Sequence, residues 1–402
     1  MLSTKIITTS LLFAAAAAAQ TLTGAWDCTV TVGTNQIPFR MEFTSSGNAV
    51  SGNFFNGDER VPSTGGQLQD GALRLAFAQY GSSLEAKLSA DGLDGRYGKE
   101  SRWYEFHAHP AVTARATTDE APNIDGVWEI ATKSAKGESA WHFIVNQKGA
   151  AVSASILRID GDTGSLTGSW KDGRFLVSHF SGARPNLIEI TPAADGSLHL
   201  LQNGRTQLTA LRPATARAQG LGAPTDPFQH TGVKDPATPL QFTFPDLNGH
   251  AVALTDARFQ NKVVVVAISG SWCPNCHDEA PFLEELYKKY RKQGLEVVAL
   301  SFEEAEQLQS LTRLRAFIQQ YGIDYTVLVP GEPGQLAEKL PQAQNLNSWP
   351  TTFFVGRDGR VRGVHAGFAG RASGEFYTQE KREVGELIEG LLAEATTSAS
   401  VR

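Results

Sequence analysis

The chain has 402 residues, of which 41% are hydrophobic and 19% are charged, and its formal net charge is −6. At roughly 150 residues per domain, this length predicts two or three domains. The composition excludes a disordered polymer or a coiled coil, and the negative charge argues against a chain-wide nucleic-acid footprint or a polybasic membrane patch.

Residues 1–19 have the pattern of a secretory signal peptide. Lys5 supplies a positive charge, the apolar run 6–19 follows it, and small residues precede Gln20. This run is shorter than the roughly 20 residues that a helix needs to cross a bilayer. An uncleaved interfacial anchor is the alternative, but a stop-transfer flank is missing. We expect cleavage near Ala19 and export, so that the mature protein is periplasmic or secreted.

Two copies of one module follow the signal. The recurring patterns share an offset of 102 residues and pair 24–26 with 126–128, 47–51 with 149–153, and 70–71 with 172–173. Short alternating runs between Gly, Asn and Asp clusters predict antiparallel hairpins in both copies. The sequence therefore predicts β module 1 at 20–115 and β module 2 at 122–212, each a barrel or sandwich filled by its own side chains.

Two features of module 1 invite a chemical interpretation. Cys28 lies in the first strand, and we interpret it as a small buried hydrophobe because its equivalent in module 2 is Ile130. His107 and His109 would share one face of a strand, as metal ligands do, but no third ligand is near in sequence. We expect two strand histidines there and no metal.

The composition changes after module 2. Segment 213–235 is rich in Pro, Gly and Ala with no apolar period, which predicts a linker. Strands and helices then alternate through 236–395, which is typical of an α/β domain. The predicted strands are 263–268, 295–300, 325–329, 351–355 and 361–364, and the predicted helices are 280–293, 311–321 and 381–395. The predicted fold is multidomain, with two all-β antiparallel barrel or sandwich modules before an α/β domain.

Cys273 and Cys276 form a C-x-x-C motif where a buried strand ends and a helix begins. Unpaired backbone N–H groups at a helix start favour a thiolate at Cys273. The spacing brings Cys276 close enough to attack a mixed disulfide made by Cys273. A structural disulfide or half of a zinc site are the alternatives, and neither explains the position between strand and helix.

Glu279 follows Cys276 by three residues and would share its helix face. A partly buried carboxylate there could take the proton from Cys276 and return it. Alternatively, Glu279 only complements the helix dipole. His277 and Asp278 are expected to be solvated residues of the first turn.

Trp349, Pro350 and Thr351 come directly before a predicted strand. Proline is excluded from the centre of a sheet and often marks a tight, cis-bonded approach to one. We therefore expect this segment to be a recognition element.

Together these residues resemble the thioredoxin superfamily, and more narrowly the TlpA/ResA-like thiol:disulfide oxidoreductases of the AhpC/TSA-redoxin clan. The motifs that carry the resemblance are 244–249, 270–276, 279–281, the extra helix and strand at 311–329, and 349–354. The resemblance covers roughly 236–395 and leaves both β modules outside it.

The resemblance implies a thioredoxin-like fold and a set of roles. Cys273 would be the exposed nucleophile, Cys276 the buried partner, and Glu279 the acid/base beneath the motif. Pro350 would be a cis-proline packed against the sulfurs, and Trp349, larger than the residues common at its position, would narrow the choice of substrate. The expected substrate surface consists of Trp272, Pro274, Trp349, Pro350 and Thr351.

These observations predict an exported enzyme that reduces disulfides of other exported proteins. It would need no cofactor beyond the Cys273–Cys276 pair, and a DsbD/CcdA-type membrane protein would recharge it. A thiol peroxidase is the alternative, but Gly270 and Val266 stand where a peroxidatic site needs Thr and Pro. A third hypothesis is that the β modules bind a ligand or partner while the C-terminal domain regulates that binding.

Overall fold

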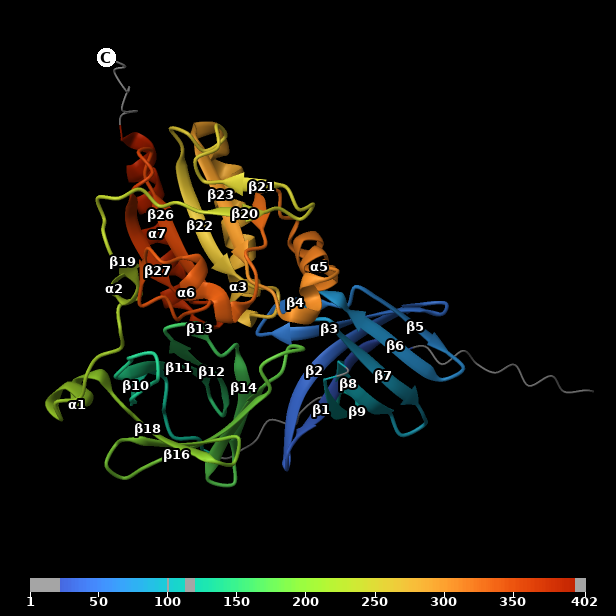
Figure 1. The fold of residues 1–402 in the computed structure, drawn as a ribbon. Coiled ribbons are helices and arrows are strands. Elements are labelled where there is room, and N and C mark those ends of the chain that lie inside the picture. The colour runs from blue at the N-terminus through green and yellow to red at the C-terminus, as the bar shows by residue number, and fades with distance from the viewer. Residues whose placement is uncertain (1–21, 100, 113–119, 395–402) are drawn as a thin grey trace, which may run out of the picture.

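The computed structural model describes residues 22–99, 101–112 and 120–394 (Figure 1). The expected signal peptide, 1–19, lies outside the described residues. In Figure 1 the two N-terminal barrels lie side by side, and the α/β domain packs across both of them. Within the described residues, no helix has the length and apolar character needed to cross a membrane.

Module 1 is a closed antiparallel barrel of eight strands. The strands of the module are these eight and β4, which lies outside the closed ring: β1 (Gly24–Val32), β2 (Asn35–Ser46), β3 (Ala49–Asn56), β4 (Glu59–Pro62), β5 (Gly65–Gln69), β6 (Ala72–Phe77), β7 (Ser82–Leu88), β8 (Leu93–Lys99) and β9 (Arg102–Pro110). The order β2-β1-β9-β8-β7-β6-β5-β3 is closed by pairing of β2 with β3, and β4 adds to β3 as a hairpin. Closure leaves the eight strands without a free edge.

Module 2 repeats this topology strand for strand. Its strands are β10 (Gly126–Ala131), β11 (Ala140–Lys148), β12 (Ala151–Arg158), β13 (Gly161–Asp162), β14 (Leu166–Lys171), β15 (Arg174–His179), β16 (Asn186–Pro192), β17 (Leu198–Gln202) and β18 (Thr206–Leu211). The order β11-β10-β18-β17-β16-β15-β14-β12 is again closed, with β13 added to β12. The duplication predicted from the sequence is therefore confirmed in the fold.

Side chains fill the interior of both barrels. In module 1 the core includes Phe54, Phe77 and Phe106, each 0% exposed. Cys28 is 2% exposed, and its equivalent Ile130 is 0% exposed, so Cys28 is a buried core residue as predicted. A buried apolar side chain contributes about 1.5–3 kcal/mol relative to an exposed one, so each barrel has its own source of stability.

The segment predicted as a linker contains regular structure. Helices α1 (Pro213–Ala218) and α2 (Pro227–His230) both begin with a proline, whose fixed φ suits the first helical position. The Asp226 carboxylate caps α2 by accepting a hydrogen bond from the Phe228 N–H at 2.9 Å. Strand β19 (Gly232–Val233) then pairs with β25 (Ala343–Gln344), which joins this segment to the α/β domain.

The α/β domain is built on a sheet of five strands in the order β24-β23-β22-β26-β27. These strands are β22 (Val263–Ser269), β23 (Leu295–Ser301), β24 (Thr326–Leu328), β26 (Thr351–Val355) and β27 (Val361–Ala366). β22 is parallel to β23 and antiparallel to β26. Every residue of β22 is buried, because both faces of the sheet are covered.

Helices cover one face of this sheet, and loops with a short helix cover the other. Val265 packs with α3 (Pro274–Tyr290), α5 (Thr312–Tyr321) and α7 (Glu375–Ala393). Val264 faces the opposite cluster, formed by 240–259 and 336–340. The remaining short elements are β20 (Thr243–Pro245), β21 (Ala251–Ala253), α4 (Ala305–Leu308), α6 (Leu336–Lys339) and the 3-10 helices η1 (Ala78–Tyr80), η2 (Arg291–Gln293), η3 (Pro333–Gln335) and η4 (Arg371–Ser373).

Candidate active site

The C-x-x-C motif forms the first turn of α3. Cys273 is the N-cap residue, and its Sγ accepts a hydrogen bond from the Cys276 N–H at 3.3 Å. Pro274 occupies the first helical position, where its missing N–H costs nothing. Both cysteines are free thiols. The helix start therefore directs the backbone N–H of Cys276 at the first sulfur, in agreement with the position that the sequence predicts for the motif.

A buried polar network fixes the loop before the motif. The Ser271 N–H donates to Glu303 Oε1 at 2.8 Å, and Arg313 Nε donates to Ser271 Oγ at 2.7 Å. Arg313 also pairs with Glu303 Oε2 at 3.1 Å, and their side chains are 3% and 0% exposed. No local pattern in the sequence connects these three residues, so the network could not be predicted from it. The network holds the residue two positions before Cys273 in place.

Both sulfurs are buried. Cys273 is 3% exposed and Cys276 is 1% exposed. Burial raises the pKa of the Cys276 thiol well above its usual range, and the neighbouring Cys273 and Glu279 raise it further. The expectation that Cys273 is an exposed nucleophile is wrong for this structure. The physical reason is that segments of module 2 pack over the motif.

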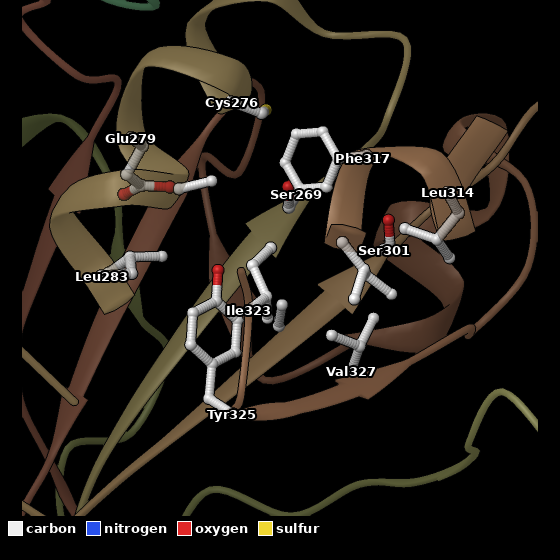
Figure 2. Close-up of a pocket in the computed structure, with 13 residues that line it drawn as sticks. Ser269, Cys276, Glu279, Leu283, Ser301, Leu314, Phe317, Ile323, Tyr325 and Val327 are labelled. Atoms are coloured by element: carbon white, nitrogen blue, oxygen red, sulfur yellow. The ribbon is translucent and has the colours of Figure 1, made fainter. Parts of the chain in front are cut away.

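Glu279 lies on the same side of α3 as Cys276, inside the domain. It is 4% exposed, and burial raises its pKa to about 8. The Thr352 hydroxyl donates to Glu279 Oε1 at 2.6 Å. Glu279, Cys276 and Tyr325 line one small cavity (Figure 2). Its volume of about 10 Å³ leaves room for about one water molecule. The carboxyl group is therefore placed beneath the second thiol.

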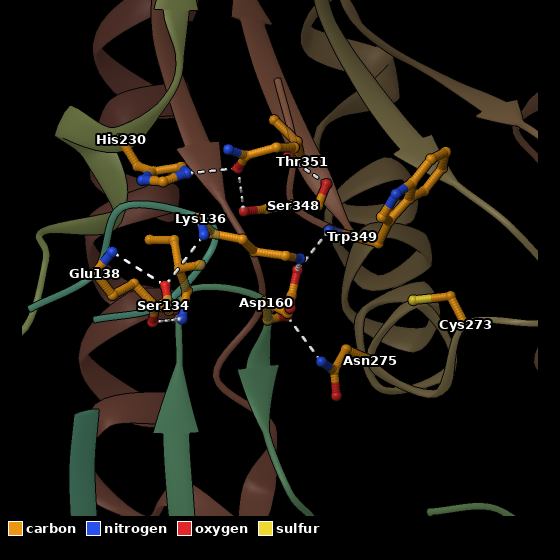
Figure 3. Close-up of polar contacts among 12 residues, drawn as sticks. Ser134, Lys136, Glu138, Asp160, His230, Cys273, Asn275, Ser348, Trp349 and Thr351 are labelled. Atoms are coloured by element: carbon orange, nitrogen blue, oxygen red, sulfur yellow. Dashed lines mark hydrogen bonds and ion pairs between the residues drawn. The ribbon is translucent and has the colours of Figure 1, made fainter. Parts of the chain in front are cut away.

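The segment 349–351 lies beside the motif. The Trp349–Pro350 peptide bond is cis. The Trp349 ring packs edge-on against Trp272, with ring centroids 5.1 Å apart, and the Trp272 Nε1–H donates to the Phe302 carbonyl at 2.9 Å. Figure 3 shows Trp349 close to Cys273. The two tryptophans and Pro274 thus gather around the first sulfur.

Thr351 does not fit the expected substrate surface. Its side chain is 0% exposed, and its hydroxyl donates to the Ser348 carbonyl at 2.8 Å. The position follows Pro350 in sequence, but the first residue of β26 points into the domain. The expectation that the Thr351 side chain contacts the substrate is therefore wrong for this structure. The side chain stabilises the turn before β26 instead.

His277 and Asp278 are not solvated, contrary to expectation. His277 is 4% exposed, its Nε2 lies 2.9 Å from the Ser271 carbonyl, and burial lowers its pKa to about 3. The ring of Tyr80, from η1 of module 1, packs against it at a tilt of 37°, with ring centroids 4.6 Å apart. Asp278 pairs with Arg184 of module 2 at 3.0 Å. The sequence could not show that both barrels cover this turn.

The paired histidines of module 1 lie away from the motif. His107 and His109 are exposed on β9, and His107 Nδ1 lies 2.7 Å from Asp94 Oδ1. Across the described part of the chain, no three His, Cys, Asp or Glu side chains gather in a way that could hold a metal ion. His107 and His109 therefore do not contribute to the thiol site.

Comparison with known proteins finds similarity in the α/β domain. Residues 233–364 match the AhpC/TSA family. Over 139 residues the chain is 29% identical to thiol-disulfide oxidoreductase ResA of Geobacillus kaustophilus, covering 35% of this chain and 73% of the relative. Over 120 residues it is 32% identical to ResA of Bacillus thuringiensis, covering 30% of this chain and 62% of the relative.

The solved structure of a DsbF homologue from Corynebacterium diphtheriae aligns with 40% of this chain and 92% of its own, at 20% identity and a TM-score of 0.32. The chain spans 73% and 62% of the lengths of the two ResA relatives. The family match and these relatives support a TlpA/ResA-like member of the thioredoxin superfamily, a thiol-disulfide oxidoreductase, for the α/β domain.

Proposed function

We propose that this protein is exported and reduces disulfides of other exported proteins through Cys273 and Cys276. The observation that carries the proposal is the start of α3, where Cys273 Sγ accepts the Cys276 N–H at 3.3 Å. That contact places two free thiols at one helix N-terminus. A dithiol in this position is suited to thiol-disulfide exchange.

The proposed reaction uses only the atoms of the dithiol and the substrate. The Cys273 thiolate attacks one sulfur of the substrate disulfide, which forms a mixed disulfide and releases one substrate thiolate. Cys276 then attacks Cys273 Sγ, which releases the second substrate thiolate and leaves a Cys273–Cys276 disulfide. Two electrons pass from the dithiol to the substrate, and the two released thiolates take up protons.

Glu279 is proposed to move the proton of Cys276. The thiol must lose its proton before it attacks, and burial disfavours the resulting anion. A carboxyl group with a pKa of about 8 can exchange a proton close to neutral pH. Glu279 and Cys276 line the same cavity, which has room for about one water molecule that could carry the proton between them.

The proposal extends to the partners. After each turnover the Cys273–Cys276 disulfide has to be reduced, and an exported enzyme has to obtain those electrons across the membrane. A membrane electron donor of the DsbD/CcdA type would supply them, as the resemblance implies. Export itself rests on the apolar run 6–19 at the start of the chain. Fractionation of the native host, with detection of the mature N-terminus, tests this part.

Capture of the substrate tests the main proposal. In a Cys276→Ser variant the mixed disulfide on Cys273 cannot be resolved, so the variant should retain its substrate covalently. Mass spectrometry of the non-reduced complex, purified from the native host, identifies the bound protein. A Cys273→Ser variant is the matched control and should retain nothing. Equal recovery of proteins with both variants would contradict the proposal.

The direction of electron flow has its own test. Equilibration of the full chain with glutathione buffers gives the reduction potential of the Cys273–Cys276 pair. A potential on the reducing side of glutathione fits a reductase. A strongly oxidising potential, like that of a DsbA-type oxidant, would reverse the proposed direction.

A further inference from the structure

The first sulfur is covered in this structure. Cys273 is 3% exposed, although a thiolate must touch a substrate sulfur in order to attack it. Access, as well as the state of the thiol, sets how fast a cysteine reacts. Part of this chain therefore has to move before a protein disulfide can reach Cys273.

The turn between β12 and β13, residues 158–161, lies over the motif. The Asp160 carboxylate accepts a hydrogen bond from the Trp349 N–H at 3.0 Å and pairs with Lys136 (Figure 3). The Asp160 carbonyl accepts hydrogen bonds from Asn275 Nδ2 at 2.9 Å and from the Phe368 N–H at 3.3 Å. One residue of module 2 thus contacts three segments that surround Cys273.

Glycines on both sides allow this contact. Gly161 bridges to Phe368, and a Cβ at Gly161 would lie 2.2 Å from the Phe368 carbonyl oxygen. A Cβ at Gly367 would lie 2.0 Å from the Ile159 carbonyl oxygen. Any side chain at either position would prevent such close backbone approach. The two surfaces therefore fit each other at the level of the main chain.

A second residue of module 2 holds the middle of the motif. Arg184 Nη1 donates to the Asp162 carbonyl and to Asn275 Oδ1, and Nη2 donates to Asp278 Oδ2. Asn275 is therefore held from two directions, by Asp160 through its amide nitrogen and by Arg184 through its amide oxygen. The contact is polar and depends on a few charge-assisted hydrogen bonds.

The duplication provides an internal reference for this turn. The equivalent turn of module 1 is 56–59, in which Asp58 stands where module 2 has Asp160 and Glu59 where it has Gly161. Asp58 is exposed, and no hydrogen bond or ion pair joins it to another described residue. The same hairpin therefore does not contact the motif in one copy and contacts it closely in the other.

From these contacts we propose that the β12–β13 turn is a removable cover of Cys273, an autoinhibitory contact that has to lift before a protein disulfide can react. The proposal rests on the proposed function and adds its regulation. In the closed state the Trp349 and Phe368 N–H groups donate hydrogen bonds to Asp160, and these donors become free when the turn lifts. An extended polypeptide beside the substrate disulfide has backbone carbonyls that can take its place.

Labelling of Cys273 in the reduced full chain tests the cover. The Asp160→Ala variant loses the carboxylate that holds the Trp349 N–H and Lys136, so we expect Cys273 to react with iodoacetamide about tenfold faster. The matched control is Asp58→Ala, which removes the equivalent carboxylate of module 1 and should label within about twofold of the parent rate. Peptide mapping by mass spectrometry separates the three cysteines.

Two further measurements make the outcome decisive. Hydrogen exchange at the Trp349 and Phe368 amides should accelerate in Asp160→Ala and stay unchanged in Asp58→Ala. Cys28, in the core of module 1, should remain unlabelled in both variants. Parent-like labelling of Cys273 in Asp160→Ala would overturn the proposal, and so would labelling of Cys28 in step with Cys273, since that marks unfolding.

The proposed function can fail separately. If Asp160→Ala accelerates labelling but the parent and the variant both fail to reduce insulin, the cover stands and the reductase proposal falls. If the parent reduces insulin and Asp160→Ala changes neither labelling nor that rate, the reductase proposal stands and the cover falls.

Discussion

The two barrels have the same strand order and differ in what one hairpin touches. In module 2 the β12–β13 turn meets the Cys273 site through Asp160 and the backbone around Gly161. The equivalent turn of module 1 contacts module 2, where Asn56 Oδ1 accepts the Ser165 N–H at 2.8 Å. It also contacts the α/β domain away from the motif, through an ion pair between Glu59 and Arg371. A duplicated scaffold can thus acquire two different contacts through changes within one turn.

The barrels also use different chemistry against the α/β domain. Module 1 packs the ring of Tyr80 on His277 and adds a pair between Lys99 and Glu304 at 3.7 Å. Module 2 contributes hydrogen bonds from Arg184 and to Asp160. Ring packing tolerates small shifts, whereas hydrogen bonds weaken steeply with misalignment. Module 2 is therefore the part whose contact is more easily broken by a single substitution.

The largest expected effect is on the rate of insulin reduction, and it compares Cys273 of the α/β domain with Cys28 of module 1. Replacement of the attacking group, Cys273→Ala, should lower the rate of insulin reduction by at least about a thousandfold. Cys28→Ala should leave that rate within about twofold and cost about 1 kcal/mol of stability, because it only removes a buried sulfur. A turbidity assay with dithiothreitol as reductant gives both rates. Comparable losses in the two variants would place part of the chemistry in module 1.

A second prediction concerns the pH dependence of stability. Glu279 has a pKa of about 8 when folded, raised from 4.5 by burial. Between these values the folded state keeps a proton that the unfolded state has released, so this group makes the free energy of unfolding fall as pH rises. A Glu279→Gln variant lacks this pH dependence. As the pH rises, its free energy of unfolding should therefore increase relative to that of the parent by up to about 1.4 kcal/mol per pH unit. Urea unfolding at pH 5 and pH 8 measures the difference.

The control for this prediction lies on the same helix. Glu285 is exposed and pairs with Lys381 at the surface of α3. The difference between Glu285→Gln and the parent should therefore change little with pH. If Glu279→Gln shows no more pH dependence than Glu285→Gln, the Glu279 carboxyl is ionised when folded and the proposed proton transfer loses its basis.

The third prediction compares two arginines of module 2. Arg184 and Asp278 have side chains that are 20% and 17% exposed, and Arg184→Ala leaves that acid without its partner. We expect a loss of about 3 kcal/mol, since breaking a largely buried pair is costly. Arg174 pairs with Glu189 at the surface, with side chains 47% and 32% exposed, so Arg174→Ala should cost less than about 1 kcal/mol. If the two variants unfold at the same urea concentration, the Arg184–Asp278 pair contributes no more to stability than the surface pair.

The smallest expected effect compares two glycines of module 2. Gly161→Ala places a Cβ against the Phe368 carbonyl, so it should loosen the turn and raise the rate of Cys273 labelling about threefold. Gly173 has φ +79 and open space around it, so Gly173→Ala should cost about 1 kcal/mol of backbone strain and leave labelling unchanged. Faster labelling in both variants would show that general loosening of module 2, rather than this contact, exposes the sulfur.

The sequence predicted what local patterns encode. The offset of 102 residues predicted the duplicated barrels, and the apolar run of β22 followed by C-x-x-C predicted a strand-to-helix thiol site. Helix α7 begins at Glu375 and not at 381. Its first turn includes Phe376, which packs on His142 of module 2, a contact that no helical period reveals.

The same limit explains the errors at the site. The burial of Cys273 depends on contacts such as Asp160 with Trp349, which are 189 residues apart in sequence. His277 was expected in solvent because its own helix offers no reason for burial, and Tyr80 of module 1 covers it. Docking between domains leaves no periodic signal, so the thiol chemistry was predictable and the access to it was not.

The order of the chain adds a consequence for how the protein is made. All strands of both barrels, 24–211, precede Cys273, so an N-terminus that is synthesised or translocated first can complete both barrels before the motif arrives. The turn that carries Asp160 would then already be folded when Cys273 and Cys276 emerge. Shielding by a neighbour built earlier would protect a reactive pair from stray oxidants during the interval before its own domain has closed.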